Sequence, residues 1–145
     1  MTFDYEKTAP VRWPHRRHQL LWSLYELASP SFQREKWLNK SPSRAGTMYG
    51  FEFVINFFFD DTDLAEHPET TLGDILVDEL EVSAVRRLGE ALNDVYKHVG
   101  PRKSDLEYLS SSIWQHVITS AQNAYSLLRP RVISEGDNIV PPDLP

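Results

Sequence analysis

The stretch E-L-E-V-S-A-V-R-R-L-G-E-A-L-N-D-V-Y-K-H-V, residues 79–99, decides the fold class of this chain of 145 residues. Its apolar side chains recur three and four positions apart, as they do on one face of an α-helix. The pair Gly100-Pro101 follows directly, and such a pair typically ends a helix. The stretch therefore predicts one long amphipathic helix, whose apolar face is carried by Val85, Leu88, Leu92, Val95, Tyr96 and Val99.

The same spacing predicts helices on both sides of this one. Residues 14–28 open with Pro14, a favoured first helical residue, and place their leucines on one face. A shorter helix is expected over about residues 30–39, after the capping residue Ser29. A final helix over about residues 111–128 carries an apolar stripe and is stopped by Pro130.

Residues 48–59, M-Y-G-F-E-F-V-I-N-F-F-F, suit either a strand or a helix, because the run is rich in strand-forming residues. However, Phe51, Val54 and Phe58 keep helical spacing, and a lone strand would leave its backbone groups unpaired. We therefore predict a buried helix, and an all-α fold in which five or six helices form a single compact bundle. The chain is expected to be one domain over residues 1–145, with an N-terminal arm over 1–12 and a Pro-rich C-terminal tail over 130–145.

Charge is unevenly distributed along the chain. The net charge is −6, but residues 46–81 contain ten Asp or Glu and no Lys or Arg, whereas residues 1–45 contain eight Lys or Arg and four acids. An acidic block does not attract a phosphate backbone, so nucleic acid is not an expected partner. The block suits a basic protein partner or a cation, although acids that only keep one face solvated would give the same pattern.

Several chemistries lack the residues that they need. The chain has no cysteine, which excludes disulfides, thiol nucleophiles and Cys-based zinc sites. It shows neither a signal-peptide pattern nor an apolar run as long as a membrane span, so we expect a cytoplasmic protein without a membrane partner. No phosphate-loop spacing and no Glu-x-x-His pair occurs. We therefore expect no catalytic residue, cofactor or metal.

The loop over residues 60–69, D-D-T-D-L-A-E-H-P-E, is the best candidate for a cation site, because carboxylates and His67 are possible ligands. Its spacing does not match an EF-hand: with Asp61 in the first position, Glu66 stands where the hand requires glycine. A metal-dependent enzyme that uses this loop is kept as an alternative.

The first turn of the helix at Pro14 is cationic, and the end of the 48–59 helix is acidic, so both oppose their helix dipoles. We expect Arg16 or Arg17 to offset this by pairing with Asp60 or Asp61 inside the fold. The acids that follow are expected to face solvent or a partner. This predicted partner-binding set is Asp63, Glu66, Glu69, Asp74 and Asp78.

The tryptophans have two expected roles. Trp37 and Trp114 lie within apolar helical patterns and are expected to anchor the core. Trp13 precedes a proline and a cationic turn, and it is either a structural clasp or a binding hot spot.

Five landmarks occur in order: W-P-H-R-R-H-Q-L-L from Trp13, F-Q-R-E-K-W ending at Trp37, F-F-D-D-T from Phe58, P-E-T-T-L-G-D-I-L-V-D-E-L-E-V from Pro68, and Y-L-S-S-S-I-W-Q-H-V from Tyr108. Together they resemble a family of small uncharacterised bacterial proteins with a W-P-x-x-R opening, a helix ending in D-D-T and a closing W-x-x-V segment. In size, charge and compartment the chain is also similar to immunity proteins of contact-dependent toxin systems.

These observations lead to three functional hypotheses. The first is a non-enzymatic binding protein, most specifically an immunity protein that neutralises a basic cytotoxic effector domain through an acidic face. The second is the metal-dependent enzyme described above. The third is a structural or self-associating α-domain, for which an exposed apolar patch would be the sign.

Overall fold

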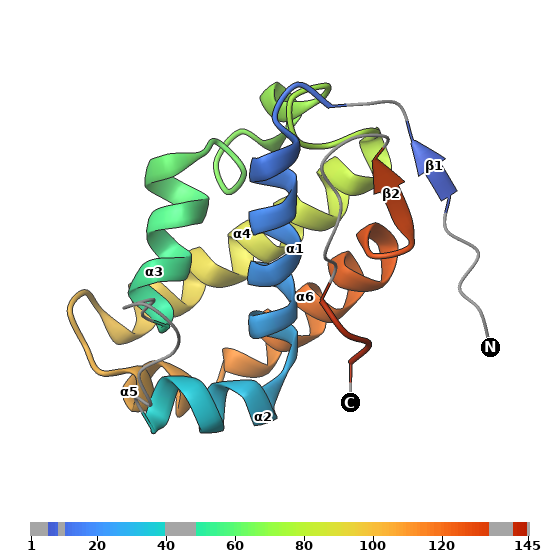
Figure 1. The fold of residues 1–145 in the computed structure, drawn as a ribbon. Helices are drawn as coiled ribbons and strands as arrows, with labels where there is room; N and C mark the ends of the chain where they lie inside the picture. The colour runs from blue at the N-terminus through green and yellow to red at the C-terminus, as the bar shows by residue number, and fades with distance from the viewer. Residues whose placement is uncertain (1–5, 9–10, 40–48, 134–140, 145) are drawn as a thin grey trace.

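The computed structural model describes residues 6–8, 11–39, 49–133 and 141–144, and most of them are helical (Figure 1). Three long helices form the centre: α1 (Pro14–Ala28), α4 (Glu79–Val99) and α6 (Trp114–Leu128). Helix α6 packs against both α1 and α4, so it is the middle helix of the bundle. The predicted all-α bundle is confirmed, and α1 and α4 begin and end where their apolar spacing places them.

The apolar stripes of the long helices supply the core. Leu20 and Leu24 of α1, Leu88 and Leu92 of α4 and Val117 of α6 have no exposed surface. Burying each such side chain stabilises the fold by roughly 1.5–3 kcal/mol, which outweighs the poor electrostatics of a cationic first turn in α1.

The short helix after α1 also serves the core. It begins as α2 (Pro30–Phe32) and continues as the π-helical turn η1 (Gln33–Leu38), with the Ser29 hydroxyl accepting from the Phe32 amide at 3.3 Å. Within it, Trp37 and Gln33 are buried. The Trp114 indole donates to the Gln33 side-chain oxygen at 3.2 Å, so this tryptophan is buried with its polar group satisfied.

The ambiguous run is helical: α3 (Phe51–Ile55) passes directly into a π-helical turn, η3 (Asn56–Asp61). The predicted helix is thus confirmed from Phe51 onward; residue 48 lies outside the described residues. Phe51 stacks on Tyr108 with ring centroids 3.9 Å apart, and Phe58 is fully buried. The Thr62 hydroxyl ends the helix by donating to the Phe57 carbonyl at 2.7 Å.

Residues 62–78 connect η3 to α4 through a 3₁₀ turn, η4 (Pro68–Thr71), and a bridge between Leu72 and Leu76. Asp78 caps the start of α4, because its side chain accepts from the Glu81 amide at 3.0 Å. Gly89 of α4 lets this connection approach closely, because a Cβ at residue 89 would lie 2.7 Å from the Ala65 carbonyl oxygen. The bundle therefore packs a loop, and not only helices, against α4.

Helix α5 (Asp105–Leu109) was not predicted, because a five-residue helix is too short to show apolar periodicity. Its local signal is the capping box of Ser104 and Glu107, in which each residue bonds the other's backbone amide.

Two three-residue strands join the predicted arm to the predicted tail. Strand β1 (Glu6–Thr8) pairs in parallel with β2 (Arg131–Ile133), and Glu6 lies opposite Arg131 (Figure 1). None of the helices in the described part of the chain combines the length and apolar character needed to cross a bilayer.

Candidate binding groove

Two adjoining hollows lie where the start of α1 meets residues 61–75, and together they form what we call the Trp13 groove. Their volumes are about 470 and 270 Å³, and Trp13, Arg16 and Asp61 line both of them. The groove thus joins the cationic start of α1 to the acidic block. Its other lining residues are Arg12, Pro14, His15, Thr62, Asp63, Thr70, Thr71, Asp74 and Ile75.

Backbone hydrogen bonds hold the two walls of the groove together. The amides of Arg12 and Trp13 donate to the carbonyls of Gly73 and Asp74, each at 2.8 Å. Gly73 has a φ of 83°, which glycine adopts without the strain of a side chain. Trp13 is 46% exposed, and the Arg12 guanidinium lies 5.3 Å from its ring centroid. A fixed backbone therefore presents an exposed indole at the edge of the groove.

Arg17 holds the groove wall from inside the fold. Its guanidinium is fully buried and donates to the Ile75 carbonyl at 2.9 Å and to both carboxylate oxygens of Glu81 at 2.8 and 3.0 Å. This geometry corrects the expected partner, because Arg17 pairs with Glu81, whereas Asp60 and Asp61 are exposed at the end of η3. A buried guanidinium needs a carboxylate that is buried with it, and only Glu81 of these three is buried.

The Arg17–Glu81 pair belongs to a larger charge network at the start of α4. Glu81 also accepts from the Val77 amide at 3.0 Å and from Arg131 at 3.1 Å. Arg131 in turn donates to Asp78 at 2.8 Å. The network therefore ties α1, α4 and the beginning of β2 together, and it engages Asp78 and Glu81 within the fold.

The acids that line the groove are placed differently. Asp61, Asp63 and Asp74 share the lining with Arg16, yet none of the three forms an ion pair within the described residues. Arg16 instead donates to the Gln19 side chain at 3.0 Å. Within the described residues, the groove therefore carries three carboxylates without an ion-pair partner, next to the two arginines Arg12 and Arg16.

The predicted partner-binding set is only partly brought together. Asp63 and Asp74 line the groove, and Glu66 is exposed outside its lining. Glu69 is also exposed but pairs with Arg86 at 2.7 Å, and Asp78 is engaged with Arg131. A hydrogen bond from its own backbone amide, followed by the contact with Arg86, lowers the pKa of Glu69. Of the five predicted residues, the structure thus brings Asp63 and Asp74 together in the groove, beside Asp61.

Two features of the structure, one in the groove and one outside it, are absent from the predictions made from the sequence. The hydroxyls of Thr62, Thr70 and Thr71 all donate to nearby backbone carbonyls at 2.7 Å, which stiffens the acidic wall. Near the other end of α1, the partly buried Glu26 accepts from the Trp37 indole at 3.1 Å, and desolvation raises its pKa to about 7 despite this hydrogen bond. The threonine hydrogen bonds are local, since each carbonyl lies three or five residues earlier in the chain, whereas the burial of Glu26 depends on which segments meet.

A metal site has no geometric support in the described residues, where no three or more His, Asp or Glu side chains are grouped so that they could hold an ion. The groove is better suited to a positively charged organic group. Carboxylates attract an ammonium or guanidinium, and the face of an indole adds a cation–π contact.

Comparisons with known proteins identify a family but no activity. The family model of a domain of unknown function (DUF7945) matches residues 11–135, so the chain belongs to this family. This agrees with the resemblance of its sequence landmarks to an uncharacterised family. No curated protein and no solved structure matches the chain.

Proposed function

We propose that this member of the DUF7945 family is a non-enzymatic protein-binding protein, and that the Trp13 groove recognises a basic protein partner. One observation carries the proposal: Asp61, Asp63 and Asp74 line a single groove beside the exposed Trp13, and none is neutralised by an ion pair in the described part of the chain. Like charges gathered in one place repel each other, and a cationic partner relieves that repulsion.

The two kinds of group would act at different stages of binding. The carboxylates steer a basic partner and raise its association rate tenfold or more at low salt. Trp13 supplies the apolar contact that slows dissociation, since tryptophan is enriched among interface residues with large energetic effects. A standard interface buries about 800 Å² on each partner, so exposed neighbours such as Asp60 and Glu66 would lie at its rim.

The narrower proposal is that the chain is an immunity protein that neutralises a cytotoxic effector domain. Its support is the similarity in size and acidity to such proteins, together with a groove that suits a basic surface. A protein of this kind needs no catalytic residue, because covering or blocking the toxin is enough.

Co-purification from the native host tests the broad proposal. The tagged chain is recovered at low salt and then washed at high salt, and bound proteins are identified by mass spectrometry. We expect a stoichiometric basic protein that the salt wash releases. A chain that elutes alone with bound metal would favour the metal-dependent enzyme, and a dimer without other partners would favour the self-associating domain.

A matched pair of charge variants tests the groove itself. The groove variant combines Asp61→Asn, Asp63→Asn and Asp74→Asn. The control variant makes the same change in net charge at exposed acids elsewhere, through Glu52→Gln, Glu90→Gln and Asp94→Asn. We expect the groove variant to slow association with the purified partner at least tenfold more than the control does. Equal association rates for both variants would refute the assignment of the groove.

The narrower proposal needs a protection assay. Cells that express the co-purified protein should lose viability, and co-expression of the wild-type chain should restore it. The groove variant should protect less well than the control variant at equal abundance. A partner that binds the groove but harms no cell would leave the broad proposal standing and overturn the immunity role.

A further inference from the structure

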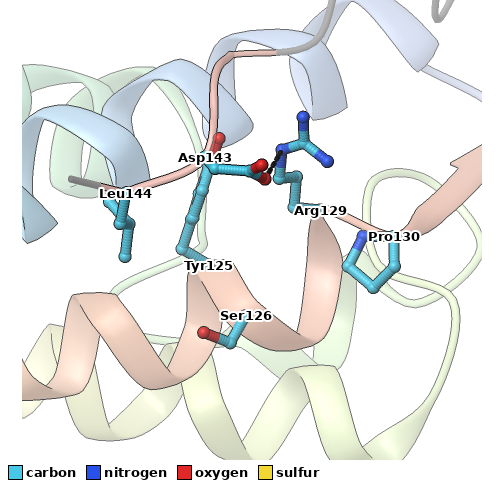
Figure 2. A pocket seen from close by; sticks show the side chains of 6 residues that line it. All are labelled: Tyr125, Ser126, Arg129, Pro130, Asp143 and Leu144. Atoms are coloured by element: carbon cyan, nitrogen blue, oxygen red, sulfur yellow. Dashed lines mark ion pairs between the residues drawn. The ribbon is translucent and has the colours of Figure 1, made fainter. Parts of the chain in front are cut away.

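The C-terminal segment, residues 141–144, lies against the end of α6, far from the Trp13 groove in the sequence. Figure 2 shows Tyr125 and Arg129 reaching from α6 toward this segment, with Asp143 beside Arg129 and Leu144 on the other side of Tyr125. Tyr125 and Arg129 are four residues apart, so they project from the same face of the helix. They form one receptor face for the segment.

Each residue of the segment makes a different contact with this face. The Arg129 Nε donates to the Pro141 carbonyl at 3.1 Å, and the Tyr125 hydroxyl donates to the Pro142 carbonyl at 2.6 Å. Asp143 lies 3.5 Å from the Arg129 Nε, and Leu144 packs partly buried against the core. Pro141 is itself buried. Along the segment, two carbonyls, one carboxylate and two apolar side chains thus contact this face in turn.

This is the chemistry by which extended proline-rich peptides are recognised. Proline has no amide hydrogen, so a Pro-Pro step presents carbonyl acceptors without leaving a donor unpaired. Aromatic side chains line the grooves that bind such peptides, and the stiffness of the peptide reduces the entropy lost on binding. The Tyr125 hydroxyl is protonated at physiological pH, as in an ordinary tyrosine, and burial raises its pKa further, to about 12.

We propose that the Tyr125–Arg129 face of α6 is a binding site for an extended peptide of the type Pro-Pro-Asp-Leu, and that the chain's own residues 141–144 occupy it as a displaceable strap. A pocket of about 170 Å³, partly open to solvent, lies beside the segment and is lined by Tyr125, Arg129 and Asp143 among others. Pro142 and Asp143 of the segment are exposed, so the segment lies on the outside of this face and is not enclosed by it. A partner peptide with the same carbonyl, acidic and apolar pattern would displace it.

The test uses the full chain and a fluorescent peptide with the sequence P-P-D-L-P. Pro141→Asp with Leu144→Asp removes the apolar contacts of the strap and frees the site without shortening the chain. Because a tethered strap competes at an effective concentration of about millimolar, we expect this variant to bind the peptide at least tenfold more tightly than the wild-type chain. Equal binding by both chains, or no binding by a folded strap variant, would overturn the proposal.

Hydroxyl deletions identify the site of binding. Added to the strap variant, Tyr125→Phe should weaken peptide binding about fivefold, which corresponds to one lost hydrogen bond. Tyr96→Phe removes the same group from an exposed tyrosine of α4 and should leave affinity unchanged. Equal effects of the two changes would place the peptide elsewhere.

If the strap variant does not fold, the wild-type chain still decides the matter. Labelling with 3-fluorotyrosine gives a resonance for residue 125 that is assigned by its loss in Tyr125→Phe. Millimolar peptide should shift this resonance, and an unchanged resonance would refute the proposal. A wild-type dimer that disappears with the strap substitutions would also overturn it, because the strap would then belong to a second copy.

Discussion

Replacing the buried Arg17 by methionine is the sharpest test of how this fold is held together. Methionine keeps the unbranched apolar stem but removes the guanidinium, which donates to Ile75 and to both oxygens of Glu81. The change leaves the Ile75 carbonyl without that donor and leaves Glu81 buried with Arg131 as its remaining cationic partner.

The expected cost follows from the complete burial of both partners. Breaking a buried ion pair by removing one member destabilises a protein by roughly 3–5 kcal/mol, because an uncompensated charge stays inside. The contact between Arg131 and Glu81 offsets part of this, so we expect about 3 kcal/mol. For a chain of this length that corresponds to a fall in melting temperature of about 10 °C.

The chain contains a matched control for this experiment. Arg86 pairs with Glu69 at 2.7 Å, a distance slightly shorter than in the buried pair, but both side chains are 46% exposed. Because water screens an exposed pair, Arg86→Met should cost no more than about 1 kcal/mol. Urea unfolding, followed by tryptophan fluorescence, measures both variants under the same conditions.

A double-mutant cycle separates the ion pair from general damage to the core. Glu81→Gln keeps an acceptor for the Val77 amide but removes the charge, so Arg17→Met combined with Glu81→Gln should cost less than the sum of the single changes by about 1–3 kcal/mol. If Arg17→Met costs no more than Arg86→Met, or if the two changes are additive, burial is not what gives this pair its strength.

Three further predictions concern residues outside the network. Gly89→Ala should lower stability by about 1–3 kcal/mol in thermal melts, because the added methyl group would press on the backbone of Ala65, and this cost outweighs the better helix propensity of alanine. A stabilised variant would contradict this. The pKa of Glu26 is about 7 in the folded chain, whereas that of an ordinary glutamic acid is 4.5, so folding takes up a proton between these pH values. The free energy of unfolding should therefore fall as the pH rises from 5 to 8, and in urea titrations at these two pH values Glu26→Gln should abolish that fall. Tyr108→Phe removes the hydroxyl that donates to the Gly100 carbonyl at 2.7 Å and should cost about 1–2 kcal/mol, while the exposed Tyr96→Phe should cost almost nothing in the same assay.

The helices could be predicted wherever the apolar pattern is long. Residues 79–99 span nearly six turns, so chance cannot easily produce their spacing, and α4 has the expected bounds. For residues 48–59, the helical spacing of Phe51, Val54 and Phe58 favoured a helix, and so did the lack of a second predicted strand to pair with, which is an argument about the whole chain. Helix α5 shows the lower limit, because five residues carry a capping signal but no period.

The residue types of the candidate site could be predicted from the sequence, but their arrangement in space could not. The acidic block and Trp13 stand out in the sequence, but neither indicates that Asp61, Asp63 and Asp74 line a groove with that tryptophan. The predicted pairing of Arg17 failed for the same reason. Ten acids lie between residues 46 and 81, and their spacing does not say which one is buried opposite α1.

The sequence by itself therefore determined the all-α class, the three long helices and the concentration of negative charge. Each of these depends on neighbours within a few turns, and short-range periodicity and composition are written directly in the order of residues. Only the tertiary structure decided that Arg17 pairs with Glu81, that Asp61, Asp63 and Asp74 share a groove with Trp13, and that residues 141–144 dock on Tyr125 and Arg129. These contacts join segments that are far apart in the chain. Which residues meet depends on which side chains are buried and on how the long helices pack.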